Sequence, residues 1–295
     1  MADSIERVIS QKGNFFGVAC NTTDLVAKAC RRHDVGPLAA AAIGRALTGA
    51  ALLAALLKDN QSVMVKFAGN GPLGKVLAEA GYDGWVRGYV AAPHAELPLK
   101  NGFIDVAAGI GHAGLLTVVK KISASKTYPG TIPLYTSEVG DDLAYYLSQS
   151  EQTPSTIGLS VHLGADGSVA AAGGFLIQSL PPADETILTA LEKNIARLPP
   201  LSQLLGQGCS PAGILSKIFG KIPHRTIHTR ELSYQCSCSI EKMENALLSL
   251  GVKELEDLAE KDCGAEVQCE FCRQKYRFSR SELEKIAAQA QKPFH

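Results

Sequence analysis

Short apolar runs separated by polar turns recur between about residues 62 and 180 of the chain. Five of these runs are rich in strand-forming residues and end at glycine, proline, asparagine or short polar stretches. They lie at residues 63–67, 85–90, 115–119, 158–163 and 175–178. Helical patterns flank or interrupt them at residues 35–57 and 139–150. We therefore predict one α+β domain, a mixed sheet-and-helix core that covers residues 1–180.

The longest apolar run, residues 35–57, is about as long as a helix that spans a bilayer. It is rich in alanine rather than leucine, it carries Arg45 in its middle, and it opens with Gly36 and Pro37. These features favour a buried helix of a soluble protein over a membrane span. We expect no membrane partner for this chain.

A different pattern begins behind Pro181 and Pro182, where apolar residues recur at helical spacing. They are Ile187, Leu188, Leu191, Ile195 and Leu198. The following apolar stretch, residues 201–219, is broken by glycine and proline. Such a segment has few local signals that fix one structure, so it should be stable only when it docks on something. We predict a helical apolar linker at residues 181–231 and a small C-terminal domain at residues 232–295.

Composition and charge limit the classes of partner. The chain has 295 residues, with 29 Lys plus Arg against 29 Asp plus Glu, and 46% of its residues are hydrophobic. This neutral, globular composition argues against a polybasic nucleic-acid binder and against an acidic disordered tail. A basic cluster at residues 273–280 interleaves with aromatic residues in a C-terminal region of net negative charge. A solvated hairpin face explains this cluster better than a nucleic-acid site.

The N-terminal residues include Asp3, Glu6, Arg7 and Lys12 among few apolar residues, so no secretory signal can be drawn. We expect a cytoplasmic protein, whose thiols are kept free by reducing buffers. Clustered cysteines are then better explained as metal ligands or redox-active groups than as permanent disulfides.

Five of the eight cysteines fall between residues 236 and 272. Cys236 and Cys238 form a C-x-C pair, and Cys269 and Cys272 form a C-x-x-C pair after 30 intervening residues. In an extended segment the side chains of residues i and i+2 point the same way, and those of i and i+3 converge in a tight turn. Two such pairs can make a tetrahedral four-sulfur site, and soft thiolates select zinc or an iron–sulfur centre. We predict one structural zinc ion per chain at these four residues.

The predicted C-terminal domain also has local folding signals. Val267, Tyr276 and Phe278 indicate a hairpin with the C-x-x-C pair at its turn. A domain of this size has little core, so a metal would help to hold it together. Thiolates are also the groups that peroxide and hypochlorous acid attack. Oxidation to disulfides would remove the ligands, and with them the metal-binding free energy, on the order of 10 kcal/mol, that folds a small zinc domain. The site can therefore act as a switch.

Capping residues place short helices around the hairpin. Ser239 can cap a helix that ends at Gly251. The apolar residues of that helix would be Met243, Leu247 and Leu250. Ser279 and Glu282 form a capping box for a last helix at residues 283–290.

Two other functions compete with a metal-dependent switch. The C-x-x-C pair, Cys269 and Cys272, is also the arrangement of a thiol-disulfide oxidoreductase. A zinc-ribbon adaptor that is indifferent to oxidants would use the same four ligands. No glycine-rich P-loop for nucleotide phosphates is present, and the G-x-G-x-x-G sequence at residues 69–74 is too close to Gly81 for a crossover helix. That sequence is interpreted as a structural turn.

The cysteine spacing, behind an apolar linker and an α+β domain, resembles that of the redox-regulated holdase chaperone family, the thirty-three-kilodalton heat-shock proteins. Other segments are similar to the core of that family, in the same order along the chain. They lie at residues 66–74, 86–90, 150–155 and 173–178. The resemblance thus covers essentially the whole chain.

This resemblance implies a binding protein and not an enzyme. In the reduced form Cys236, Cys238, Cys269 and Cys272 would bind zinc and the chaperone would be inactive. Oxidants would join Cys269 to Cys272 and Cys236 to Cys238, release zinc and unfold the C-terminal domain. The linker would then expose its apolar residues, Ile187 to Leu198 among them, to unfolded or oxidatively damaged client proteins without ATP. The activated form would be a homodimer.

Four cysteines lie outside the two pairs. Cys263 departs from the family's pattern and could compete as a ligand or pair wrongly, although an inert thiol is the simpler interpretation. Cys20, Cys30 and Cys209 are scattered along the chain and are interpreted as small buried apolar residues.

Overall fold

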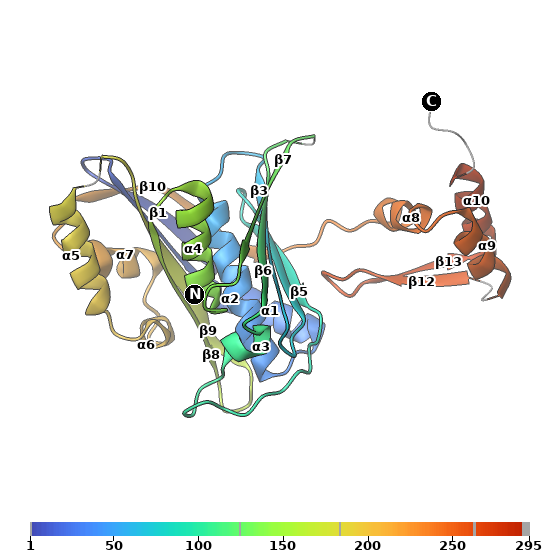
Figure 1. Cartoon of the computed structure of the whole chain (residues 1–295), viewed down its shortest axis with the longest axis horizontal. Helices are drawn as coiled ribbons and strands as arrows, with labels where there is room; N and C mark the ends of the chain where they lie inside the picture. The colour runs from blue at the N-terminus through green and yellow to red at the C-terminus, as the bar shows by residue number, and fades with distance from the viewer. Residues whose placement is uncertain (1, 124, 183, 262–263, 291–295) are drawn as a thin grey trace. The chain divides into compact units, whose positions relative to one another are not determined.

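The computed structural model describes residues 2–123, 125–182, 184–261 and 264–290. The chain divides into two compact units, Met1–Gln235 and Cys236–His295, each of which is described by itself (Figure 1). The first unit holds two β-sheets and helices α1 to α7, and the second holds a hairpin and helices α8 to α10. The α+β class expected from the sequence is confirmed.

Two sheets form the framework of the first unit. The first sheet has the strand order β10-β1-β2-β9-β8, with β1 (Ser4–Ser10), β2 (Phe15–Asn21), β8 (Ser155–Leu163), β9 (Val169–Ser179) and β10 (His224–Glu231). The second sheet has the order β11-β5-β4-β3-β6-β7, with β3 (Ser62–Gly69), β4 (Lys75–Gly81), β5 (Trp85–Val90), β6 (Gly114–Lys121), β7 (Thr127–Pro133) and β11 (Ser233–Tyr234). Neighbouring strands are antiparallel, except that β11 runs parallel to β5.

Helix α2 (Pro37–Ala54) lies between the two sheets and contacts strands of both (Figure 1). Gly36 occupies its N-cap position, and the fixed backbone of Pro37 suits the first helical turn. Among the described residues, α2 is the helix that is long and apolar enough to cross a membrane, and 89% of it is buried inside the protein. The prediction of a buried helix within residues 35–57 is confirmed.

The five predicted strands fall within β3, β5, β6, β8 and β9, and the helix predicted at residues 139–150 is α4 (Val139–Glu151). Helices α1 (Thr23–His33) and α3 (Val106–Ile110) complete this part of the fold. Strands β1, β2, β4 and β7 were not predicted. Alanine and glutamate in β4 and two prolines in β7 are poor strand formers, and pairing with β3 and β6 outweighs their local preference. Residues 69–74 form the turn between the antiparallel strands β3 and β4, as the interpretation of the glycine motif requires.

Helices α5 (Glu185–Ala196), α6 (Leu201–Gly206) and α7 (Pro211–Phe219) pack on the first sheet and share an apolar cluster with it. Phe15, Ile177 and Phe175 come from the sheet, and Phe219 and Leu215 come from α7. The five apolar residues proposed for client binding belong to this cluster or pack against it: Leu191 is 2% exposed, while Ile187, Leu188, Ile195 and Leu198 are partly buried. In this conformation these side chains are part of, or pack against, the apolar cluster that the first sheet and α7 form.

Strand β10 lies inside the segment expected to be a helical linker. Its sequence, HRTIHTRE, is polar and its side chains are mostly exposed, so apolar periodicity gives no sign of a strand there. The strand forms because its backbone pairs with β1 at the edge of the first sheet. The division of the chain at residues 180 and 231 stays a prediction.

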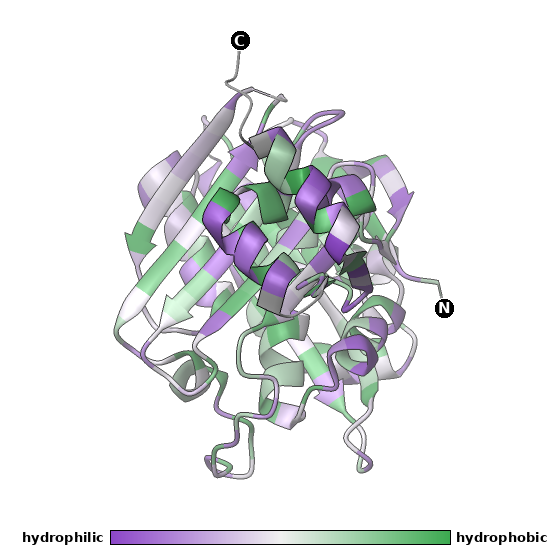
Figure 2. Cartoon of the chain, turned by 90° about the vertical axis from the view of Figure 1, so that its right-hand side faces the viewer, coloured by the Kyte–Doolittle hydropathy of each residue, from purple (hydrophilic) through white to green (hydrophobic). Residues whose placement is uncertain are grey.

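The second unit is built on a β-hairpin of β12 (Gly264–Gln268) and β13 (Lys275–Ser279) with helices α8 (Ile240–Leu248), α9 (Val252–Lys261) and α10 (Arg280–Ala290). Its helices carry both hydrophilic and hydrophobic residues, as the ribbons nearest the viewer in Figure 2 show. Their apolar residues form a small cluster with the hairpin. The buried members are Leu247, Leu255, Ala259, Phe278, Leu283, Ile286 and Ala287.

The capping residues act as expected. The Ser239 hydroxyl accepts a hydrogen bond from the backbone N–H of Lys242, and the Glu282 carboxylate accepts one from the N–H of Ser279 at 2.8 Å. One detail of the prediction is wrong: α8 ends at Leu248, so Leu250 lies beyond the helix and is 52% exposed. The turn that precedes Gly251 carries Leu250 away from the core.

One buried carboxyl group makes the stability of the first unit depend on pH. Asp3 is 6% exposed and accepts hydrogen bonds from the backbone N–H groups of Asp24 and Leu25 at the start of α1. Burial raises the pKa of Asp3 to about 6, although the two hydrogen bonds act to lower it. The folded chain therefore holds this proton more tightly than the unfolded chain does.

We expect Asp3 to make the free energy of unfolding fall as the pH rises from about 4 to about 6, by on the order of 2 kcal/mol, with no further loss above that pH. The fluorescence of Trp85, the single tryptophan of the chain, reports urea unfolding of the first unit at each pH. Asp3→Asn should flatten this part of the pH profile. An identical profile for the variant would contradict the assignment.

Candidate metal centre

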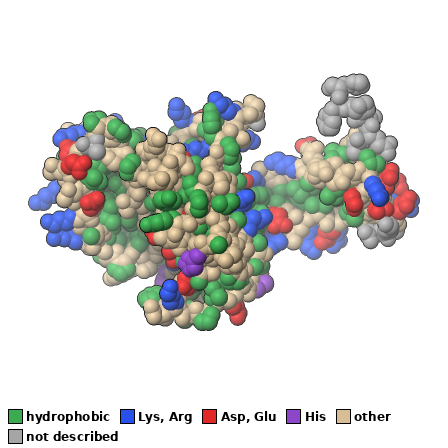
Figure 3. All heavy atoms as spheres, in the orientation of Figure 1, with side chains coloured by type: hydrophobic (Ala, Val, Ile, Leu, Met, Phe, Trp, Pro, Cys, Tyr) green, Lys and Arg blue, Asp and Glu red, His purple; other side chains and the backbone are tan. Residues whose placement is uncertain are grey.

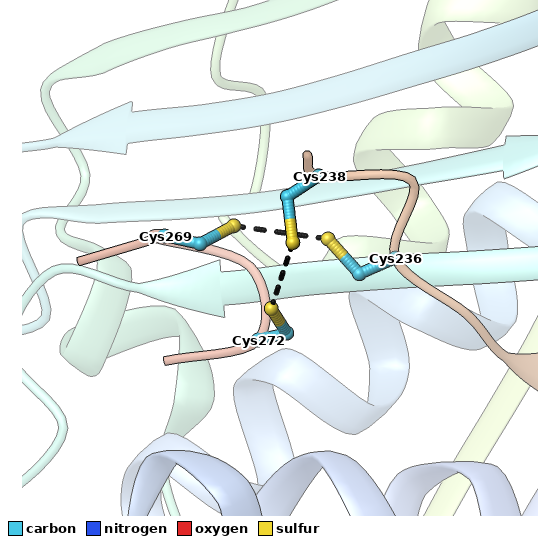
Figure 4. A group of neighbouring side chains, drawn as sticks. All are labelled: Cys236, Cys238, Cys269 and Cys272. Carbon is cyan, nitrogen blue, oxygen red and sulfur yellow. Dashed lines mark hydrogen bonds between the residues drawn. The ribbon is translucent and has the colours of Figure 1, made fainter. Parts of the chain in front are cut away.

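The structure brings the four predicted ligands together. The Sγ atoms of Cys236, Cys238, Cys269 and Cys272 all lie within 4.8 Å of one another (Figure 4). The Cys236–Cys269 and Cys238–Cys272 sulfurs are 3.7 and 3.3 Å apart. Sulfurs bound to one tetrahedral zinc at about 2.3 Å lie about 3.8 Å from each other. Both the donor set and its size therefore fit a tetrahedral metal site with four cysteine ligands.

Local backbone structure positions each pair. Cys236 and Cys238 flank one residue in the segment that leads to Ser239, the cap of α8. Cys269 and Cys272 lie in the turn of the β12–β13 hairpin, as predicted. In that turn the N–H of Cys269 donates to the Gln274 carbonyl, the N–H of Arg273 donates to the Cys269 carbonyl, and Arg273 has a left-handed φ of 59°. The turn thus directs both sulfurs of the C-x-x-C pair toward the C-x-C pair (Figure 4).

The thiols of Cys236, Cys238 and Cys272 differ in acidity. Burial acts to raise the pKa of the Cys238 thiol, but hydrogen bonds from Tyr276 and Cys272 outweigh it and lower this pKa to about 7. Burial raises the pKa of Cys236, and burial together with the hydrogen bond to Cys238 raises that of Cys272. The Cys238 thiolate therefore forms easily, whereas ionisation of a second thiol beside it is opposed by repulsion between the two negative charges. A bound dication would remove that repulsion and let all four sulfurs ionise.

Among the described residues, this is the group of three or more His, Cys, Asp or Glu side chains placed to share a metal ion. Cys20 is fully buried, and burial raises the pKa of its thiol. Cys30 and Cys209 are half-buried rather than fully buried, and each packs against an apolar cluster of the first unit. Cys263, whose role the sequence left open, lies outside the described residues.

Tyr276 is a neighbour of the sulfurs that the sequence did not indicate as part of the site. The hydroxyl of Tyr276 donates a hydrogen bond to Cys238 Sγ at 3.1 Å. The sequence indicated Tyr276 only as an apolar strand residue. The single signal in the sequence was an aromatic hydroxyl four positions after Cys272. Whether that hydroxyl reaches a sulfur depends on the pairing of β13 with β12.

Three basic side chains of the cluster at residues 273–280 are paired with carboxylates. Lys275 and Arg277 contact Glu266 at 2.7 and 3.0 Å, and Arg280 contacts Glu284 at 2.8 Å. On the face shown in Figure 3, each unit carries both acidic and basic side chains. These contacts support the interpretation of residues 273–280 as a solvated face.

Comparisons with a family model, with curated relatives and with a solved structure all indicate the same protein family. The family model described as Hsp33 protein matches residues 3–279. The chain is 57% identical to the 33 kDa chaperonin of Desulfotalea psychrophila, over 97% of each chain, and 47% identical to that of Geobacter sulfurreducens, over 97% of this chain and 95% of the relative. The crystal structure of the 33 kDa chaperonin of Thermotoga maritima, 37% identical, has a TM-score of 0.90 and covers 98% of this chain and 99% of its own. The chain therefore belongs to the Hsp33 family of chaperones.

Proposed function

We propose that this chaperone is a redox-regulated holdase that works without ATP. In the reduced form Cys236, Cys238, Cys269 and Cys272 would hold one zinc ion, and the protein would be inactive. The observation that carries the proposal is the convergence of four sulfurs, from two motifs 30 residues apart, in a unit with a small apolar cluster. A zinc site with four cysteine ligands has no open coordination position, so it supplies folding energy rather than catalysis.

Oxidation would act on the ligands themselves. Formation of one disulfide removes two electrons from two thiolates, and one hydrogen peroxide takes up these electrons with two protons to give two water molecules. Two disulfides would therefore consume two peroxides and leave no thiolate to hold the metal. Within a tetrahedral site all sulfur pairs are close, so distance does not select the partners. The pairing of Cys269 with Cys272 and of Cys236 with Cys238 follows the resemblance to the family.

Loss of the metal would unfold the second unit, because its apolar cluster is too small to hold about 60 residues together. The linker would then release apolar residues for clients. We assign client binding to Ile187, Leu188, Leu191, Ile195 and Leu198, which now pack on or beside the first sheet. The partners would be unfolded or oxidatively damaged proteins, the active form a homodimer, and the location the cytoplasm.

We expect oxidation to switch the activity on. Zinc-loaded protein treated with hydrogen peroxide at mild heat should release about one equivalent of zinc and suppress aggregation of a thermally unfolding client. Reduced, zinc-loaded protein at the same concentration is the control and should leave aggregation unchanged. Zinc release without any suppression would contradict the proposal.

An oxidoreductase function predicts a different result. Catalytic disulfide exchange by Cys269 and Cys272 would reduce insulin with turnover in the metal-free protein. The holdase proposal predicts no turnover above that of a variant in which both cysteines are serine. A zinc-ribbon adaptor, in turn, would keep residues 236–290 folded after oxidation.

A further inference from the structure

Tyr276 contacts the four-sulfur site, although it is not one of the four predicted ligands. Its hydroxyl is 3.1 Å from Cys238 Sγ, and the two residues are 38 positions apart in the chain. The bond therefore joins the C-x-C segment to the hairpin that carries the other two cysteines. It joins a phenol hydroxyl of β13 to a sulfur of the C-x-C pair.

The pleat of β13 aims Tyr276 at this sulfur. Residues 276 and 278 lie on one side of the strand, and Lys275 and Arg277, which pair with Glu266, lie on the other. Phe278 is 3% exposed in the apolar cluster of the second unit, and the ring of Tyr276 packs against the same cluster. The ring is thus held by packing, while its hydroxyl remains available to the sulfur.

We infer that Tyr276 is a positioning residue of the metal site. Its hydroxyl orients the Cys238 thiolate toward the metal, so that zinc is held more tightly, and it withdraws negative charge from that sulfur, so that oxidants attack the sulfur and release zinc more slowly. This inference rests on the proposed zinc-bound, reduced form. Hydrogen bonds to a ligand from outside the coordination shell fix its orientation and tune its electron density. A hydrogen bond to a thiolate also lowers the intrinsic nucleophilicity of that sulfur toward peroxide.

Tyr276→Phe removes the hydroxyl and keeps the ring. In the full-length reduced variant we expect zinc affinity, measured by competition with a chromogenic chelator, to fall about 10-fold to 100-fold. Zinc release at a fixed peroxide concentration should be faster. Tyr128→Phe is the matched control, because Tyr128 is a half-exposed tyrosine of β7 in the other unit and should leave both quantities unchanged.

Cobalt substitution separates an electronic role from a structural one. In the cobalt(II)-loaded Tyr276→Phe variant, the sulfur-to-cobalt charge-transfer band should move to lower energy, since a thiolate without its hydrogen bond gives up electron density more readily. The intensity of the ligand-field bands in the same spectrum reports whether the site is still tetrahedral and folded.

Unchanged zinc affinity, release rate and charge-transfer energy in Tyr276→Phe would overturn the inference and leave the proposed function intact. A wild-type protein that binds neither zinc nor cobalt would overturn the proposed function, and the role of Tyr276 with it. Weaker binding with the expected band shift, while Tyr128→Phe matches wild type, would support the role of Tyr276.

Discussion

Replacement of Cys269 by serine is expected to abolish tight zinc binding and to unfold residues 236–290 in the reduced protein. Cys269 is the most buried of the four cysteines, at 5% exposure, so its loss also leaves a poorly filled position. A structural zinc site with four thiolate ligands contributes on the order of 10 kcal/mol to folding, far more than single core contacts do. The apolar cluster of the second unit cannot replace that contribution.

Zinc content by atomic absorption and limited proteolysis of the full-length chain measure this effect. The variant should contain no zinc, lose its C-terminal fragment rapidly and suppress client aggregation without any oxidant. Cys30→Ser is the control, because Cys30 is a half-buried thiol of α1 outside the site. A Cys269→Ser protein that keeps one zinc ion and a protected C-terminal unit would exclude the proposed ligand set.

The second large effect is expected from Gly17 in β2, which faces α7. A Cβ atom at Gly17 would lie 2.6 Å from the ring of Phe219 and 2.9 Å from the side chain of Leu215, both fully buried. Gly17→Val therefore forces α7 away from the first sheet, at a cost of about 1–3 kcal/mol or more. Since the four cysteines are untouched, zinc should remain bound while linker surface is exposed.

Reduced, zinc-loaded Gly17→Val should bind a hydrophobic dye and suppress client aggregation in part without oxidant. Gly206→Val is the matched control, because Gly206 lies in α6 with open space around its Cβ position. If Gly17→Val retained zinc and still showed neither dye binding nor activity, displacement of the linker helices would not be the source of client binding.

The metal site was the part of the molecule most accessible from sequence. The type and the spacing of the ligands can be read directly from the sequence. The sulfurs of Cys236, Cys238, Cys269 and Cys272 come together as that spacing predicts. The contact from Tyr276 was not accessible, because it depends on the register of a hairpin whose strands are only five residues long. A one-residue shift would turn this side chain to the opposite face.

The packing of the linker could be predicted from the sequence only in part. The apolar periodicity of residues 187–198 correctly indicated a helix, although α5 ends at Ala196 and Leu198 lies beyond it. The periodicity could not distinguish a helix face that packs inside the protein from one that binds clients. In the structure Leu191 is buried in the apolar cluster that the first sheet and α7 share, and polar β10 follows later in the chain as an edge strand. Strand pairing with β1, which is far away in the sequence, determines the conformation of that segment.

The proposed redox switch requires that oxidation converts ordered segments of the chain into exposed ones. Hydrogen exchange of the full-length chain, followed by mass spectrometry in the reduced zinc-loaded and the oxidised forms, measures this directly. We predict loss of protection at residues 236–290 and in helices α5 to α7, while β2, β9 and α2 stay protected. Retained protection of the second unit in an oxidised, zinc-free and chaperone-active sample would contradict the proposed unfolding switch.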